Sequence, residues 1–134
     1  MRFEDLKVGM KASVAKTITE SDVTLYAGLT LDINPAHLNE QYAKTTMFKR
    51  RIAHGMLTAG LVSAVLGTKL PGEGSIYMGQ ELMFTAPVYF GDTITATVEI
   101  IELISEKNRV ILSTTCTNQD GETVLKGKAK IMKK

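Results

Sequence analysis

The apolar positions in the second half of the chain recur with a period of two, which is the pattern of half-buried strands. It is clearest over residues 93–100, where isoleucine, alanine and valine alternate with threonine and glutamate. The apolar phase then shifts to Ile101 and Leu103, as a β-bulge requires. This segment is therefore predicted to be a long strand that carries a bulge.

Further strands follow from the same pattern. Residues 110–117 and 124–132 flank Asp120-Gly121, which is a strong signal for a hairpin turn. Residues 80–89 are predicted to form a strand that Pro87 interrupts, and residues 12–18 are a short β-branched stretch. The strand over 124–132 places three lysines on one face, which we expect to meet solvent and to protect a sheet edge: Lys126, Lys128 and Lys130.

The first half of the chain is predicted to be helical and rich in loops. Thr19, with Asp22 three residues later, forms a weak capping box for a helix that is expected to end near Gly28. Asn34-Pro35 suits the start of a second helix over residues 35–44, because proline is favoured at the first helical position. A loop is expected over residues 45–51.

The segment from His54 to Leu70 is apolar nearly all round and includes several small residues. Its length and its lack of alternation favour a helix over a strand. A helix without a polar face is typically buried on all sides. We therefore expect a central buried helix that ends at the sequence Leu70-Pro71-Gly72.

These elements predict an α+β fold in which a curved, mostly antiparallel sheet of four or five strands wraps around one long apolar helix. A chain of 134 residues is expected to form one domain over residues 1–134. Such a sheet has free edges, and pairing two edges in a homodimer would hide one of them.

Composition narrows the classes of partner. The net charge is +2, and the only dense basic cluster is Lys49-Arg50-Arg51, so nucleic acid is not expected as a partner. That cluster either contacts the phosphates of a small molecule or belongs to a solvated loop. The single cysteine, Cys116, fits a core position and a reducing compartment. We find no pattern typical of a signal peptide or of a membrane span, and expect a cytoplasmic protein.

Residues able to carry chemistry crowd into one short stretch. Asp32 and His37 lie five positions apart around Asn34-Pro35, and an imidazole can exchange protons near neutral pH. His54-Gly55 opens the long helix, whose first N–H groups could hold an oxyanion. From residue types alone, the simpler interpretation is that Asp32 and Asn34 form turns and caps and that His37 lies on the surface.

Four segments resemble the R-specific enoyl-CoA hydratases of the MaoC-like dehydratase family. The stretch Tyr26–His37, followed by Ala43, is similar to the signature of that family, and Arg51–Leu57 is similar to the start of its central helix. Pro71–Tyr77 and Pro87–Asp92 resemble its strand-entry segments. The resemblance covers nearly the whole chain and implies a hot-dog fold, a homodimer and no cofactor.

By this resemblance, Asp32 and His37 are the catalytic pair that holds a water and guides its syn addition to a trans-2-enoyl thioester. Asn34 would orient the loop or the pair, and the N–H of Gly55 would bind the thioester oxygen. Ser63 would either bond near the pair or bond back to its own helix. His54 would be a third catalytic group or a structural residue. A metal site made of Asp32, His37 and His54 is disfavoured, since the family is metal-free.

Two positions depart from the family pattern. Leu31 stands where the family usually has glycine, and Ala36 stands where it usually has a larger aliphatic residue. If the glycine position requires a positive φ, leucine is strained there. The departures are expected to change the loop shape or the acyl pocket.

Several functions remain open from the sequence. The first is hydration of enoyl-CoA, and the same chemistry in reverse is a 3-hydroxyacyl dehydratase acting on CoA or on acyl carrier protein. The others are a hot-dog thioesterase and a non-catalytic module that binds acyl thioesters. Four methionines are candidates either for the core or for an adaptable lining of an acyl pocket: Met47, Met56, Met78 and Met83.

Overall fold

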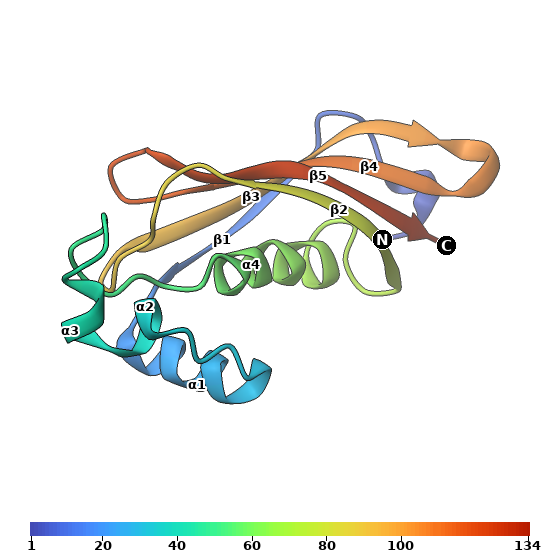
Figure 1. Ribbon diagram of the computed structural model, residues 1–134. Coiled ribbons are helices and arrows are strands. Elements are labelled where there is room, and N and C mark those ends of the chain that lie inside the picture. Colours follow the sequence, from blue (N-terminus) through green and yellow to red (C-terminus); the bar gives the residue numbers. More distant parts are fainter.

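A five-stranded antiparallel sheet curves over the helix α4 in the computed structural model, which describes all residues 1–134 (Figure 1). The helices are α1 (Glu20–Thr30), α2 (Pro35–Leu38), α3 (Glu40–Ala43) and α4 (Gly55–Thr68), and short 3-10 turns lie at Phe3–Asp5 and Ser105–Lys107. The strands are β1 (Lys11–Thr17), β2 (Ser75–Phe84), β3 (Thr93–Ile104), β4 (Arg109–Thr117) and β5 (Thr123–Lys133).

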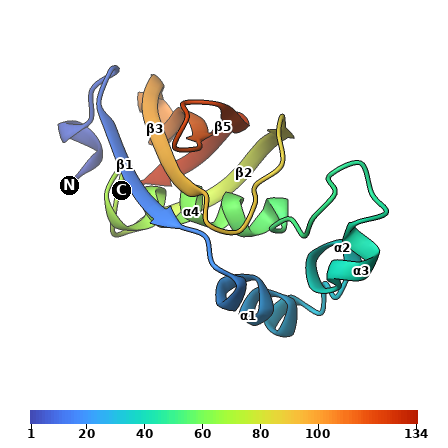
Figure 2. The same cartoon turned by 90° about the vertical axis from the view of Figure 1, so that its left-hand side faces the viewer.

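The strand order across the sheet is β1-β3-β4-β5-β2, and every neighbouring pair is antiparallel. Figure 2 shows three layers: the sheet, then α4 beneath it, then α1, α2 and α3 on the far side of α4. This is the hot-dog fold of the α+β class, which the sequence predicted. None of the helices combines the length and the apolar character that a membrane span requires.

The core lies between the inner face of the sheet and α4. The inner positions of β3 and β4 are completely buried, as their period of two predicted, and they pack with Val62, Val65 and Leu66 of α4 in one cluster. Burying one such side chain contributes about 1.5–3 kcal/mol to stability. The packing of α4 against the sheet therefore fixes where the first turn of this helix lies.

Two local sequence signals are confirmed. The pairing of β3 with β4 shifts between Ile100 and Glu102, so the bulge lies at Ile101. Asp120-Gly121 turns the chain from β4 into β5, with Gly121 at a φ of 78°. Lys126, Lys128 and Lys130 are exposed, but β5 lies inside the sheet between β4 and β2. The expectation that these lysines protect an edge is therefore wrong, because the two edges are β1 and β2.

Other boundaries differ from the sequence prediction. The predicted helix over residues 35–44 breaks at Asn39, which ends α2 and caps α3 by accepting a hydrogen bond from the N–H of Tyr42. The strand predicted over 80–89 instead spans Ser75–Phe84, because the chain leaves the sheet before Pro87. The helix α4 is not buried on all sides: Met56, Gly60 and Ser63 are exposed on the face turned away from the sheet.

The helix α1 begins as predicted and ends later than predicted. Thr19 and Asp22 form a complete capping box. The helix passes through Gly28 and ends at Leu31, which adopts a left-handed conformation with a φ of 66°. The strain that the sequence suggested for leucine at this position is thus present. Leu31 gains no packing in return, since its side chain is 81% exposed.

We predict that Leu31→Gly stabilises the chain by about 1 kcal/mol. Relief of the left-handed strain contributes roughly 1–2 kcal/mol, and part of this is lost because glycine gives up more conformational entropy on folding than leucine does. Urea titration should show a higher midpoint with an unchanged slope. Leu31→Ala is the control, since it removes the exposed side chain but keeps the strained Cβ, and it should leave the midpoint in place. A lower midpoint for the glycine variant would contradict this account.

Candidate functional site

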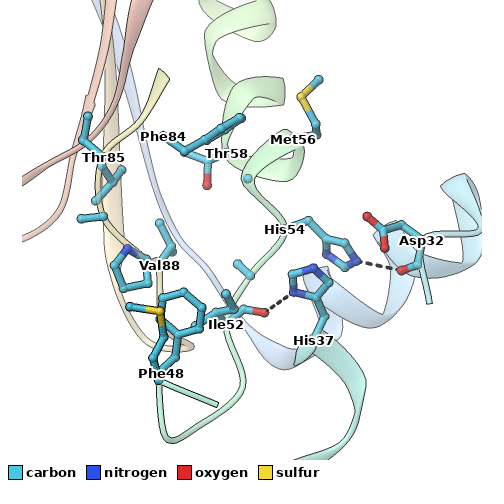
Figure 3. A pocket seen from close by; sticks show the side chains of 16 residues that line it. Asp32, His37, Phe48, Ile52, His54, Met56, Thr58, Phe84, Thr85 and Val88 are labelled. Atoms are coloured by element: carbon cyan, nitrogen blue, oxygen red, sulfur yellow. Dashed lines mark hydrogen bonds between the residues drawn. The ribbon is translucent and has the colours of Figure 1, made fainter. Parts of the chain in front are cut away.

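A cavity of about 510 Å³ opens beside the first turn of α4 (Figure 3). Its wall combines the start of α4, the loop that follows α3, and residues 84–88 at the end of β2 and beyond. Most of its lining is apolar, including Phe48, Ile52 and Val88. Asp32, His37 and His54 bring polar groups to one side of it. An apolar cavity with a few convergent polar groups is the usual form of a small-molecule site.

The chain between α1 and α2 holds Asp32 at the cavity. The Asp32 carboxylate accepts a hydrogen bond from the N–H of Asn34 at 3.4 Å, which closes a turn. Asn34 then caps α2, because its side-chain oxygen accepts from the N–H of Ala36 at 2.9 Å. Asn34 therefore caps the helix that carries His37, and the turn and cap interpretation of Asp32 and Asn34 is confirmed. A catalytic role of Asp32 stays a prediction, which the turn does not oppose because the side chain remains exposed.

His37 is held in one tautomer. Its Nδ1 lies 2.8 Å from the carbonyl oxygen of Ile52, which can only accept, so Nδ1 carries the proton. The lone pair is left on Nε2. Burial lowers the pKa of His37, and the neighbouring His54 lowers it further, while the hydrogen bond to Ile52 and the charge of Asp32 oppose these effects. Because its pKa lies below the ordinary value near 6.5, His37 is neutral at pH 7 and can accept a proton.

His54 connects the Asp32 loop to α4. Its side chain is 2% exposed, and Nε2 donates to the carbonyl oxygen of Asp32 at 2.9 Å. Its ring packs against Tyr26 and His37, with ring centroids 4.6 and 3.9 Å away. The Nδ1 atom of His54 has no hydrogen-bond partner. His54 thus joins three segments of the chain around the cavity.

Asp32, His37 and His54 each offer a possible metal-ligand atom, and these atoms lie within 4.8 Å of one another. The centroids of the two imidazole rings lie 3.9 Å apart, with 32° between the ring planes. Nδ1 of His37 and Nε2 of His54 are already bonded to backbone carbonyls, so only one nitrogen of each ring is left for an ion.

The start of α4 presents free backbone donors. The N–H groups of Gly55 and Met56 donate to no group of the chain, as is usual for the first residues of a helix. A Cβ atom on Gly55 would lie 2.7 Å from the ring of Phe84, so any larger residue would require that ring to move. Partial positive charge at a helix N-terminus favours an anionic or carbonyl oxygen there.

Arg51 is not a free cation. Its Nε donates to the carbonyl oxygen of His37 at 2.7 Å, its Nη1 pairs with Glu20 at 2.9 Å, and its guanidinium lies over the ring of Phe90. Its side chain is only 13% exposed. Both sequence interpretations, a phosphate ligand and a solvated loop residue, are therefore wrong for Arg51. Sequence reasoning missed its role, because nothing in a basic cluster distinguishes the one residue that folds inward.

Of the other candidate residues named from the sequence, some line the cavity and others lie outside it. Gly55, His54, Met47 and Met56 line the cavity, whereas Met78 and Met83 lie on β2 outside it. Ser63 is exposed, does not line the cavity, and makes no hydrogen bond with the pair or with its own helix. Both alternatives for Ser63 are wrong for the single chain, because position 63 lies on the face of α4 turned away from the sheet. Cys116 is buried in β4, as predicted.

We predict that Arg51→Lys lowers the free energy of unfolding by about 1–3 kcal/mol, because lysine cannot bond the carbonyl of His37 and the carboxylate of Glu20 together. Urea titration measures the change. The matched control is Arg50→Lys, since Arg50 lies over the ring of Tyr89 on the exposed surface and should tolerate lysine within about 0.5 kcal/mol. Equal effects of the two variants would show that the internal bonds of Arg51 are unimportant.

Comparison with known proteins places this chain in a family. The sequence model described as "MaoC like domain" matches residues 4–122. The (R)-specific enoyl-CoA hydratase of Rhodospirillum rubrum is 60% identical over 97% of this chain and 90% of its own length. The 3-hydroxybutyryl-CoA dehydratase of Methylorubrum extorquens is 52% identical over 95% of this chain and 80% of its own length.

A solved structure gives the same result. The (R)-hydratase from A. caviae, described as involved in PHA biosynthesis, superposes with a TM-score of 0.94 at 43% identity and covers 98% of this chain and 99% of that one. Sequence and structure agree over nearly the whole length. The chain therefore belongs to the MaoC-like dehydratase family.

Proposed function

We propose that this protein is an R-specific enoyl-CoA hydratase that adds water reversibly to trans-2-enoyl-CoA and forms (R)-3-hydroxyacyl-CoA. One observation carries the assignment of the site: a carboxylate, a neutral imidazole with a free Nε2 and two unpartnered helix amides lie in the wall of one apolar cavity. The hydratases that the chain resembles act on such thioesters by name.

In the proposed reaction, Asp32 and His37 hold one water between the carboxylate and Nε2. The water oxygen bonds to C3 of the enoyl group while one of its protons passes to the pair. The electrons of the C2=C3 bond move toward the thioester, whose oxygen carries negative charge until C2 receives a proton on the same face. The free N–H of Gly55 stabilises that charge. One water is added in total, and no cofactor is required by this balance.

The same site can run in the opposite direction. The relative from Methylorubrum extorquens is named a dehydratase, and a mitochondrial relative from Solanum lycopersicum, 39% identical, is named for an acyl-carrier-protein substrate. The second candidate is therefore a 3-hydroxyacyl dehydratase on CoA or on acyl carrier protein. Asp32 and His37 would have the same roles, so the two candidates differ in direction and in the carrier alone.

The first test is the loss of enoyl absorbance when the purified protein meets crotonyl-CoA. We expect the wild type to be active and Asp32→Asn and His37→Gln each to lower kcat/KM by about 10²–10⁴-fold or more. Asp5→Asn, an exposed change far from the cavity, is the matched control and should keep full activity. Chiral analysis of the product should give the R form.

Other outcomes would point elsewhere. Inactivity with crotonyl-CoA, with longer enoyl-CoAs and with enoyl-acyl carrier protein would contradict the hydratase assignment. Release of free thiol in the same assay would identify a thioesterase, and binding without turnover would identify a non-catalytic acyl-thioester module.

We further propose that the working form is a homodimer joined along β2. This strand is a free edge of the sheet, and its inner-face residues Tyr77 and Phe84 are well exposed although their β5 partners, Ile131 and Leu125, are fully buried. An exposed apolar edge strand is a template for pairing with a second copy. Phe84 also lines the cavity, so a second copy on β2 would close that side of the site.

We predict that Tyr77→Glu makes the protein monomeric, because the charge would be buried between the two edges. Sedimentation velocity or light scattering measures the mass. Leu25→Glu is the control, since Leu25 is also an exposed apolar residue, 65% against 41% for Tyr77, but lies on α1, and this variant should remain dimeric. A dimer that survives the change at Tyr77 and dissociates with the change at Leu25 would place the interface on α1 instead.

A cytoplasmic location is proposed from the cysteine. Cys116 is free and buried, and burial raises the pKa of its thiol to about 12, so it is protected from oxidation and forms no disulfide within the chain. This suits a reducing compartment. We likewise propose that residues 1–134 act as one domain.

A further inference from the structure

Thr58 is a polar residue that the proposed mechanism does not yet use. It lies on α4 one turn after His54, is 1% exposed, and lines the cavity. Its hydroxyl oxygen has no hydrogen-bond partner in the chain. Figure 3 shows that oxygen on the cavity side of the helix, near Phe84. Nearly all buried polar groups in native proteins are paired, so an orphaned hydroxyl in a cavity indicates a missing partner.

The hydroxyl does not take the partner that a helix normally offers. A threonine within a helix can donate to the carbonyl oxygen four residues earlier. Thr30 and Thr68 do so in this protein, at 2.8 Å to Tyr26 and at 2.6 Å to Ala64. Thr58 does not bond the carbonyl of His54 in this way, although its own N–H does. Its rotamer therefore directs the hydroxyl away from the helix backbone.

The neighbours of the hydroxyl indicate what it would bind. Thr58 follows Gly55 by three residues, which places both on the same face of α4, and helical side chains lean toward the N-terminus. Both residues also line the cavity, so the hydroxyl and the free N–H of Gly55 face it from the same side of the helix. The rest of this wall, including Phe84 and Val88, is apolar. Two donors in the same apolar wall match a single acceptor oxygen.

We propose that Thr58 is a second donor of the oxyanion site, and that its O–H bonds the thioester oxygen together with the N–H of Gly55. This inference rests on the proposed hydratase function. The oxygen gains negative charge as the water bonds to C3 and loses it when C2 is protonated. A fixed donor at that oxygen is worth more in the transition state than in the bound substrate. Thr58 accordingly acts on kcat more than on KM.

The test compares Thr58→Val, which keeps the shape and removes the hydroxyl, with Thr58→Ser, which keeps the hydroxyl. With crotonyl-CoA we expect Thr58→Val to lower kcat about 10²–10³-fold, as for loss of one oxyanion donor, with little change in KM. Thr58→Ser should stay within about threefold of the wild type. The thermal midpoint of the valine variant should be unchanged or higher, since the valine removes an unpaired buried polar group.

The matched control is Thr114→Val. Thr114 is equally buried, but its hydroxyl accepts a hydrogen bond from Gln80 at 3.0 Å. Its replacement leaves one N–H of the Gln80 amide without a partner while the bond from that amide to the carbonyl of Glu81 remains, so the thermal midpoint should fall while kcat/KM of the folded protein stays near the wild type. If Thr58→Val behaves like this control, Thr58 is structural, for example through a bond to the free Nδ1 of His54, and the proposal is overturned.

A spectroscopic readout separates this inference from the proposed function. Butyryl-CoA labelled with ¹³C at the carbonyl cannot be hydrated, so its infrared carbonyl stretch reports hydrogen bonding in the bound state alone. Wild type and Thr58→Ser should lower the stretch frequency, and Thr58→Val should lower it less. An inactive wild type that still shows this difference would refute the hydratase function and keep the Thr58 contact. Equal shifts in all three proteins would refute the contact.

Discussion

The site depends on one buried hydrogen bond, from Nε2 of His54 to the carbonyl oxygen of Asp32 at 2.9 Å. It joins the first turn of α4, which the core holds in place, to the loop that carries the carboxylate. The bond from His37 Nδ1 to the carbonyl of Ile52 is its counterpart on the neighbouring ring. Because both carbonyls can only accept, each bond also selects a tautomer. The position of the two rings and their tautomers are therefore set by the same two contacts.

The strain at Leu31 belongs to the same arrangement. The left-handed turn at the end of α1 brings the next residue, Asp32, back toward α4, where His54 receives it. A residue in a sparsely populated conformation persists only when its surroundings determine it, and here the His54 bond and the α2 cap at Asn34 do so on either side. The chain thus tolerates an unfavourable leucine because the elements that flank it leave the backbone no alternative.

Local patterns were sufficient for much of the fold. The period of two located β3 and β4, the phase shift located the bulge at Ile101, and Asp120-Gly121 located the hairpin. The signature read along the chain also named Asp32 and His37; both line the cavity, and their catalytic role stays a prediction. The predictions that were wrong depended on tertiary context. Asn39 ends α2 and caps α3, although the sequence on either side of it is compatible with one continuous helix. Ser63 was expected near the catalytic pair because its helix is apolar, but it lies on the exposed face of that helix. Neither Thr58 nor Arg51 has a local sequence signal. Arg51 contributes through its bonds to the carbonyl of His37 and the carboxylate of Glu20, which are distant in sequence. The role proposed for Thr58 rests on the absence of a partner for its hydroxyl.

The contact between Phe84 and Gly55 links two properties that are usually separate. Phe84 lies on the free edge strand, half exposed, and its ring lies against Gly55, whose amide is the proposed donor to the thioester oxygen. Any event that moves the edge strand therefore moves the wall against the amide. If two chains meet along this edge, assembly and completion of the oxyanion site become one equilibrium, and the specific activity would fall on dilution, in step with the loss of paired chains.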